Sequence, residues 1–158
     1  MQLNEKDIRL LELLQSDCKM GLKEIARNLK SPVTTVHEKI KRFEKEGIIR
    51  KYTAVLDDKK LDKLLTVFIF VSIKYHFPDE KNPLSQREIA ERISRIPNVQ
   101  DVHIITGDWD LLLKVKGRDM AEISSFVIDR LRSIKGVDRT LTAACFEVVK
   151  ESLELTLR

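Results

Sequence analysis

The chain has 158 residues, enough for one domain or two small ones. Of these residues 42% are hydrophobic and 34% charged, a composition that favours a water-soluble protein. No apolar run is long enough to cross a membrane, and the polar, acidic N-terminus is unlike a signal peptide, so we expect a cytoplasmic protein. The net charge of +4 is mildly basic, which is compatible with a nucleic-acid partner.

Three helices are expected at the start of the chain. The first covers residues 5–16 with Asn4 as its N-cap, and the second covers residues 22–29. The pair Lys30-Ser31 breaks the chain before the third helix, in which Ser31 is the expected N-cap, Pro32 the first helical residue and Gly47 the left-handed stop. The expected buried positions are Ile8, Leu11, Leu14, Leu22, Ile25, Ala26, Leu29, Val33, Val36, Ile40 and Phe43.

A short helix, a tight turn and a longer helix with a polar face form the helix-turn-helix pattern. Between Lys30 and Lys51 the chain has seven basic and three acidic residues, so the positive charge is concentrated in the third helix and just beyond it. The pattern therefore favours a helix that enters the major groove of DNA. A purely structural three-helix unit with a solvated basic face would have the same pattern.

Residues 48–56 have the composition of a strand, and the charged stretch 57–65 is interpreted as a linker whose charges balance. We therefore expect a helix-turn-helix DNA-binding domain over residues 1–56, a linker over 57–65 and a second domain over 66–158.

The second half alternates strands and helices. Strands are expected at 65–75, 99–106, 109–116 and 137–149, a loop at 76–83, and a hairpin turn at Gly107-Asp108. Capping boxes at Ser85 and Asp119 open two helices, and Gly136 ends the second. The expected inward residues of these helices are Ile89, Ile93, Ile96, Met120, Ile123, Val127, Leu131 and Ile134.

The order βαββαβ predicts a ferredoxin-like domain, an antiparallel four-stranded sheet with both helices on one face. The expected fold class is thus α+β, with a winged-type helix-turn-helix domain followed by this βαββαβ domain. Residues 66–73 are apolar almost throughout, whereas a strand with one covered face should alternate. This excess indicates that a partner subunit covers the other face, and it supports a homodimer.

Residues that could support catalysis are few and scattered. The three histidines, His37, His76 and His103, lack metal-ligand spacing, and Cys18 and Cys145 form neither a metal motif nor a disulfide framework. Asp108 and Asp110 lie beside the expected turn, but two carboxylates there more often serve turn chemistry than catalysis. We therefore expect no enzyme, no metal and no cofactor.

At this point the order of motifs resembles the Lrp/AsnC, or feast/famine, family of transcription regulators. The matching stretches are DIRLLELLQ at 7–15, LxxIAR at 22–27, VxxxIxxFExxGII at 36–49, YTAVLD at 52–57, TGDWDLLLK at 106–114, TxT at 140–142 and FEVVK at 146–150. No single stretch is diagnostic, but together they span nearly the whole chain. Lys30-Ser31 and Glu38-Lys39 depart from the family pattern, which usually has Gly-Leu in the turn and often an Arg pair in the recognition helix. The loop at 76–83 also looks longer than the family's typical connection.

The resemblance implies a sequence-specific regulator that binds double-stranded DNA and whose assembly or DNA affinity responds to a small molecule, most simply an amino acid. It implies homodimers that assemble further to tetramers or octamers, associated with the nucleoid. The candidate DNA contacts are Ser31, Val33, Thr34, Thr35, His37, Glu38, Lys39, Lys41, Arg42, Arg50 and Lys51. The candidate effector contacts are Gly107, Asp108, Trp109, Asp110, Thr140 and Thr142.

Two alternatives stay open at this point. One is an amino-acid-sensing module without a specific DNA target, which the basic third helix disfavours. The other is a nonspecific DNA-compacting protein, which would show no preference for one promoter.

Overall fold

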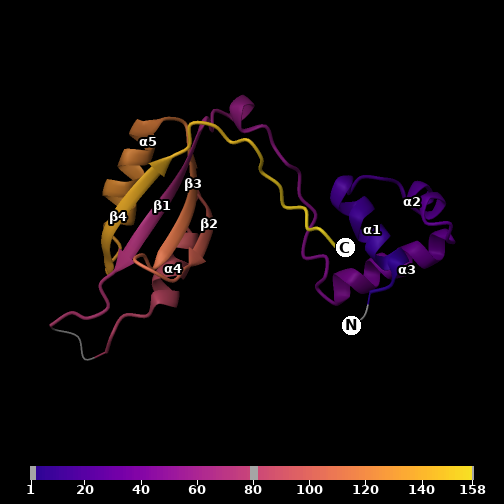
Figure 1. Cartoon of the computed structure of the whole chain (residues 1–158), viewed down its shortest axis with the longest axis horizontal. Helices are drawn as coiled ribbons and strands as arrows, with labels where there is room; N and C mark the ends of the chain where they lie inside the picture. The colour runs from indigo at the N-terminus through magenta and orange to yellow at the C-terminus, as the bar shows by residue number, and fades with distance from the viewer. Residues whose placement is uncertain (1–2, 79–81, 158) are drawn as a thin grey trace. The chain divides into compact units, whose positions relative to one another are not determined.

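The computed structural model describes residues 3–78 and 82–157 (Figure 1). The chain divides into two compact units, each with a hydrophobic core of its own. The first comprises Met1–Val55 with Glu151–Arg158, and the second comprises Leu56–Lys150.

Three helices build the first unit: α1 (Glu5–Ser16), α2 (Leu22–Asn28) and α3 (Val33–Lys45). The expected bounds of the first helix are confirmed, since Asn4 and Asp7 form a reciprocal capping box at its start. The buried side chains of this core are Leu10, Leu11, Ile25, Ala26, Leu29, Val36 and Phe43. The expectation that Leu22 and Val33 are buried is wrong, because these residues of the first helical turns are 37% and 40% exposed.

The turn between α2 and α3 forces Lys30 into the left-handed region, with φ at 47°. The Ser31 N–H donates to the Ala26 carbonyl and the Lys30 N–H to the Arg27 carbonyl, which is the Schellman arrangement that ends a helix. Lys30 therefore adopts the left-handed conformation that a glycine would take more readily at this turn. The expected N-cap is wrong: Pro32 occupies that position, and the Ser31 hydroxyl donates to the Leu29 carbonyl instead.

Replacing Lys30 with glycine is expected to stabilise the first unit by about 0.5–1 kcal/mol, because a left-handed residue with a Cβ costs roughly 1–2 kcal/mol, partly offset by the backbone freedom of unfolded glycine. Urea denaturation followed by far-UV circular dichroism measures this change. The matched control is Gly47→Ala, since Gly47 ends α3 at φ 72° with open space around its Cβ position. That variant should lose stability for the same reason, and a loss in both variants would contradict the explanation.

The segment after α3 differs from expectation. Residues 48–56 form no strand: the backbone is extended, but no described segment pairs with it. Residues 58–61 of the expected linker form a short 3-10 helix (Asp58–Leu61), and Asp58 makes an ion pair with the buried Lys116 of the sheet. The C-terminal segment also contributes to the first unit, where the Gln15 side chain exchanges two hydrogen bonds with the Leu155 backbone.

The second unit is an antiparallel sheet with strand order β2-β3-β1-β4, as a ferredoxin-like domain requires. Its strands are β1 (Leu65–Ile73), β2 (Val99–Ile104), β3 (Leu111–Gly117) and β4 (Val137–Ala144). Helix α4 (Gln86–Ser94) and helix α5 (Met120–Ser125), which continues as the π-helical segment η2 (Phe126–Leu131), cover one face. Every second residue of β1, from Val67 to Ile73, enters the core beneath them.

Several details of this unit correct the expectations. Met120 is 50% exposed, whereas Phe126, which had not been expected to be inward, is buried. The connection between β2 and β3 spans residues 105–110 rather than two residues, because the Ile105 N–H bonds to the Asp110 carbonyl and closes a wider turn. The last strand ends at Ala144, and residues 79–81 of the expected loop 76–83 lie outside the described residues.

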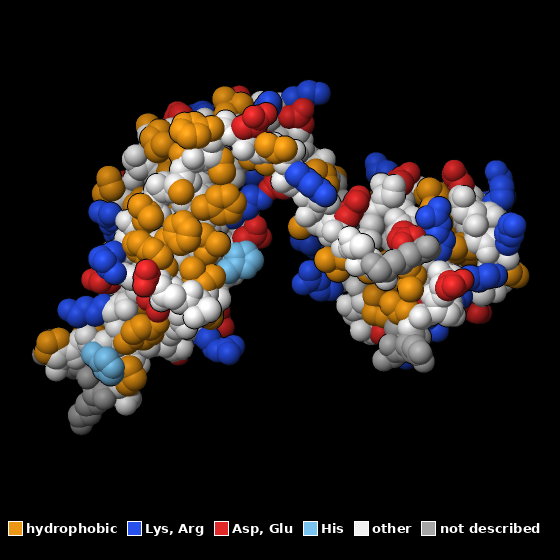
Figure 2. Space-filling view, in the orientation of Figure 1, with side chains coloured by type: hydrophobic (Ala, Val, Ile, Leu, Met, Phe, Trp, Pro, Cys, Tyr) orange, Lys and Arg blue, Asp and Glu red, His pale blue; other side chains and the backbone are white. Residues whose placement is uncertain are grey.

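No helix within the described residues covers the other face of the sheet. Phe68, Leu141 and Ala143 are exposed there and Phe70 is half-buried, and Figure 2 shows hydrophobic side chains gathered over the strands of this unit. We call this surface the open face. Its residues are those that alternate with the core positions of β1 and their partners on β3 and β4. Within the described residues no helix is long and apolar enough to span a membrane.

Candidate functional site

One face of α3 is exposed along its length. Thr34, His37, Glu38 and Lys41 follow each other at helical spacing and are all exposed, opposite the buried Val36 and Phe43. We call these four residues the reading stripe. A helix with this pattern can present its N-terminal half to a DNA groove while its apolar side holds it on the rest of the unit.

A second row on α3, formed by Lys39 and Arg42, turns toward α1, and Thr35 before them is half-buried. The Asp7 carboxylate on α1 is 2% exposed and lies against this row. Lys39 Nζ donates to one Asp7 oxygen, and Arg42 Nη2 lies 3.4 Å from the other, which also accepts the Asn4 N–H at 3.2 Å. Burial alone would raise the pKa of Asp7, but these donors and the charges of Lys39 and Arg42 hold its pKa below the ordinary 3.8.

Sequence reasoning missed Asp7, although a signal was present. Asp7 occupies a position of the apolar stripe of α1, beside Leu3, Leu10, Leu11 and Leu14, where a carboxylate must find a buried cation. The consequence is that two of the candidate DNA contacts, Lys39 and Arg42, already have a partner inside the chain.

The remaining DNA candidates lie around this helix. Ser31 is half-buried in the turn, where its hydroxyl accepts a hydrogen bond of 3.1 Å from the Lys6 ammonium. Val33 at the start of α3 is exposed, and so are Arg50 and Lys51 beyond its end. The first unit thus brings the candidate DNA contacts together on and beside α3, but some of them are exposed and others are partly buried.

In the second unit the loop 105–110 is shaped by Asp110. Its carboxylate accepts the Ile73 N–H at 2.6 Å and the Tyr75 hydroxyl, while Gln86 Nε2 donates to its carbonyl at 3.2 Å. Burial, followed by the hydrogen bond to Asp110 and the charge of Asp110, raises the pKa of Tyr75 to about 12. Asp110 therefore fixes this loop to the end of β1.

The neighbours of Asp110 are more accessible. Gly107, with φ at 115°, and Asp108 are exposed at the tip of the loop. The half-buried Trp109 lies 6.0 Å from the Phe70 ring between centroids, and the Arg139 guanidinium lies over the indole at 5.5 Å. Asp108 and Arg139 supply opposite charges near an aromatic surface, which is suitable chemistry for a small zwitterion.

Thr140 and Thr142 lie elsewhere. They pair with Val71 and Ile69 of β1, so they share the helix-covered face, whereas Trp109 packs on Phe70 of the open face. Thr140 accepts hydrogen bonds from the Arg132 guanidinium at 2.9 and 3.1 Å. A single chain therefore does not gather the six effector candidates into one cavity.

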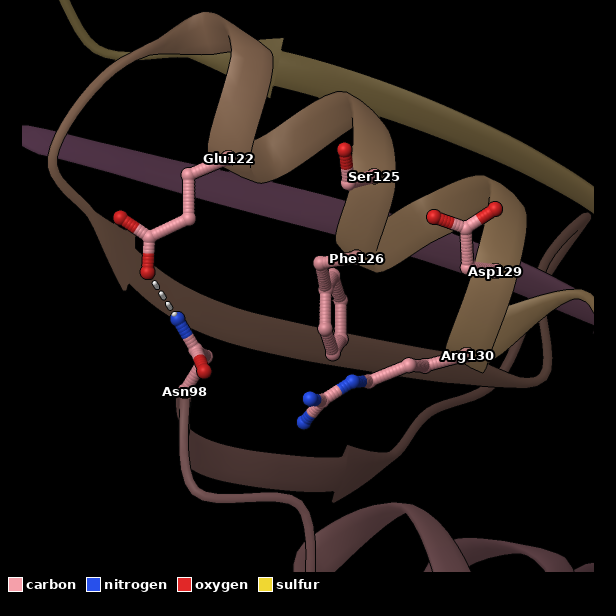
Figure 3. Close-up of a pocket in the computed structure, with 6 residues that line it drawn as sticks. All are labelled: Asn98, Glu122, Ser125, Phe126, Asp129 and Arg130. Atoms are coloured by element: carbon pink, nitrogen blue, oxygen red, sulfur yellow. Dashed lines mark hydrogen bonds between the residues drawn. The ribbon is translucent and has the colours of Figure 1, made fainter.

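A separate pocket of about 220 Å³ lies beside α5 and η2 and is lined by Asn98, Glu122, Ser125, Phe126, Asp129 and Arg130 (Figure 3). The Glu122 carboxylate accepts hydrogen bonds from the Arg118 N–H at 2.7 Å, the Asn98 side-chain amide at 2.7 Å and the Lys63 ammonium at 3.3 Å. None of the effector candidates lines it. Glu122 is therefore a structural acceptor that ties the start of α5 to Asn98.

Glu122 should make the second unit sensitive to acid. The Arg118 N–H, then the Asn98 side chain, then Lys63 lower the pKa of Glu122 from 4.5 to about 2. A folded pKa below the unfolded one gives stability that is present above pH 4.5 and lost as the pH falls toward 2. Urea denaturation followed by Trp109 fluorescence should show Glu122→Gln less stable than wild type at neutral pH, with the gap closing in acid. A gap independent of pH would contradict this assignment.

Comparison with known families covers both units. The Lrp/AsnC ligand binding domain matches residues 66–155, and a winged helix-turn-helix DNA-binding domain matches residues 3–50. An uncharacterised HTH-type transcriptional regulator of Pyrococcus horikoshii is 45% identical over 151 residues, covering 96% of this chain and 97% of the relative. The HTH-type transcriptional regulator FL11 of Pyrococcus furiosus is 31% identical over 156 residues, covering 99% and 97%.

Solved structures agree with these matches. A transcriptional regulator of Neisseria meningitidis in complex with L-Met superposes with a TM-score of 0.89 at 28% identity, covering 99% of this chain and 97% of that one. An AsnC family regulator of Agrobacterium tumefaciens gives a TM-score of 0.87 at 26% identity, covering 98% and 97%. From the matched domains and these relatives, the chain belongs to the Lrp/AsnC family of transcription regulators, with a DNA-binding helix-turn-helix and a ligand-binding domain.

Proposed function

We propose that this regulator binds specific DNA sequences and that an amino acid changes its assembly or its DNA affinity. The observation that carries the proposal is the Neisseria meningitidis regulator in complex with L-Met, which shares 28% identity and matches nearly the whole chain. The exposed reading stripe and the accessible charges beside Trp109 support the two halves of this function.

The reading stripe, with Val33 and Thr35 beside it, is the proposed base-reading surface. Threonine can contact a thymine methyl or a base edge, Glu38 can accept from cytosine, and Lys41 can donate to guanine. Arg42, Arg50 and Lys51 are the proposed phosphate contacts, with Ser31 at the turn. One such helix reads few base pairs, so a two-fold dimer that reads two half-sites about one DNA turn apart gives the selectivity.

Assembly is proposed to use the open face. Phe68 and Leu141 are 36% and 50% exposed on this apolar surface. Because β1 is apolar almost throughout, the partner proposed to cover this face is a second copy of the chain. Larger assemblies, tetramers or octamers, would follow from contacts between dimers. At such a contact the loop 105–110 can meet another copy, and the amino acid can bind there.

The proposed effector contacts are Gly107, Asp108, Trp109, Asp110, Thr140 and Thr142. Asp108 would pair with the α-ammonium of the ligand, and the exposed backbone N–H groups around Gly107 would donate hydrogen bonds to its carboxylate. Because Asp110 already serves as acceptor for Ile73 and Tyr75, its role is to hold the loop in place. The two threonines would contribute from a neighbouring copy, since they lie on the other side of their own sheet.

The test is a titration of the twenty amino acids, L-methionine first, against the chain bound to a DNA fragment selected from genomic DNA. Binding is followed by gel shift, assembly by sedimentation and the ligand by Trp109 fluorescence. One or a few amino acids should change DNA affinity or assembly. DNA binding without sequence preference would favour a DNA-compacting protein, and ligand binding without DNA binding would favour a sensor module.

A further inference from the structure

The buried carboxylate of Asp7 is the starting point. It lies between α1 and α3 with 2% of its surface exposed, and its two oxygens face Lys39 and Arg42 of the recognition helix. A carboxylate in this position is stable only while a cation and hydrogen-bond donors compensate its charge. The ion pairs of Asp7 therefore hold α3 against α1. They also determine whether the charges of Lys39 and Arg42 can reach DNA.

Lys39 is the closer partner. Its side chain is only 19% exposed, and its ammonium donates directly to Asp7. Moving this ammonium to a DNA phosphate would leave Asp7 buried with Arg42 as its one remaining ion-pair partner among the described residues. The loss of this compensation opposes a transfer of Lys39 from Asp7 to a phosphate.

Arg42 is held differently. Its side chain is 44% exposed and reaches Asp7 with one nitrogen at 3.4 Å. A guanidinium has five N–H donors, so the outer donors can reach a phosphate while the inner nitrogen stays beside Asp7. The Asp7 carboxylate therefore keeps the Lys39 ammonium away from phosphate, while it holds the Arg42 guanidinium where its outer donors can reach one.

We propose that Asp7 is a specificity-determining residue for DNA binding: it removes Lys39 from phosphate binding, so that the recognition helix holds arbitrary DNA weakly and depends on its reading stripe. The proposal rests on the DNA-binding function of the helix-turn-helix. Positive charge that contacts phosphate strengthens binding to every sequence, whereas base contacts strengthen binding only to the correct one. A counter-ion that α1 supplies to this helix therefore raises the ratio of specific to nonspecific affinity.

The salt dependence of affinity measures this directly. Each phosphate contact adds about 0.9 to the slope of log affinity against log salt concentration. For a random-sequence duplex, Asp7→Asn should steepen the slope by about that amount and raise the affinity severalfold at low salt. The affinity for the selected genomic fragment, divided by the affinity for the random-sequence duplex, should fall. Lys39→Met should leave the slope as in wild type, because that ammonium makes no phosphate contact.

The matched control is the double variant Asp7→Leu with Lys39→Met, which replaces the ion pair by an apolar pair of similar size and keeps α3 packed. Far-UV circular dichroism verifies that its helices are intact, and its salt slope should equal that of wild type. A slope that falls by about 0.9 in Lys39→Met alone would overturn the proposal, as would an unchanged slope in a folded Asp7→Asn. A wild-type chain that binds neither duplex would instead overturn the DNA-binding function itself.

Discussion

Replacing Phe43 with alanine is expected to destabilise the helix-turn-helix unit by about 3–5 kcal/mol and to abolish DNA binding. Phe43 is fully buried on α3, in a core to which the described residues contribute seven buried side chains. A unit this small has a total stability of only several kcal/mol, so the variant should leave it mostly unfolded. Far-UV circular dichroism should show the lost helix, and a gel shift the lost complex.

The matched control is Leu22→Ala, because Leu22 belongs to the same unit but is 37% exposed. That variant should change the free energy of unfolding by no more than about 0.5 kcal/mol. In Phe43→Ala the second unit should stay folded, with native Trp109 fluorescence, since it has a core of its own. Equal losses in the two variants would contradict the assignment of the core.

The sequence predicts the helices well where several signals agree. Asn4 and the apolar spacing of Ile8, Leu11 and Leu14 together predict α1, and Gly47 marks the end of α3 as expected. The signals fail where a residue's environment depends on distant segments. Ile48, Tyr52 and Val55 favour a strand by composition, but a strand needs a neighbour to bond with, and no described segment supplies one.

In the candidate sites, too, local features can be predicted from the sequence and contacts between distant segments cannot. The exposed positions of α3 follow from helical spacing, whereas the capture of Lys39 by Asp7 needs the packing of α1 on α3. In β4, simple alternation would turn Leu141 toward the core, yet its register with Phe70 places it on the open face and sends Thr140 to the helices. A choice between two faces is set by pairing, which the local sequence does not reveal.

The two carboxylates of the 105–110 loop should behave differently when each is replaced with alanine. Asp108 is exposed, and no hydrogen bond or ion pair within the described part of the chain uses its side chain. Asp108→Ala should therefore preserve folding and basal DNA affinity. It should weaken the amino acid by about 1.5–3 kcal/mol, or roughly ten- to a hundredfold, through loss of a charge-assisted hydrogen bond. Titration by Trp109 fluorescence and gel shift measures both effects.

Asp110→Ala should act on the fold first. It leaves the Ile73 N–H without its acceptor and frees the Tyr75 hydroxyl, which should cost about 1–3 kcal/mol of stability. The pKa of Tyr75 should fall from about 12 toward 10, because burial remains while the bond and the charge of Asp110 are lost. Absorbance titration in a Tyr52→Phe background isolates this tyrosine, since Tyr52 also has a raised pKa. If Asp108→Ala moved the Tyr75 pKa while Asp110→Ala left it unchanged, the division between ligand contact and loop support would be wrong. If neither variant altered the amino acid response, the effector would bind away from this loop.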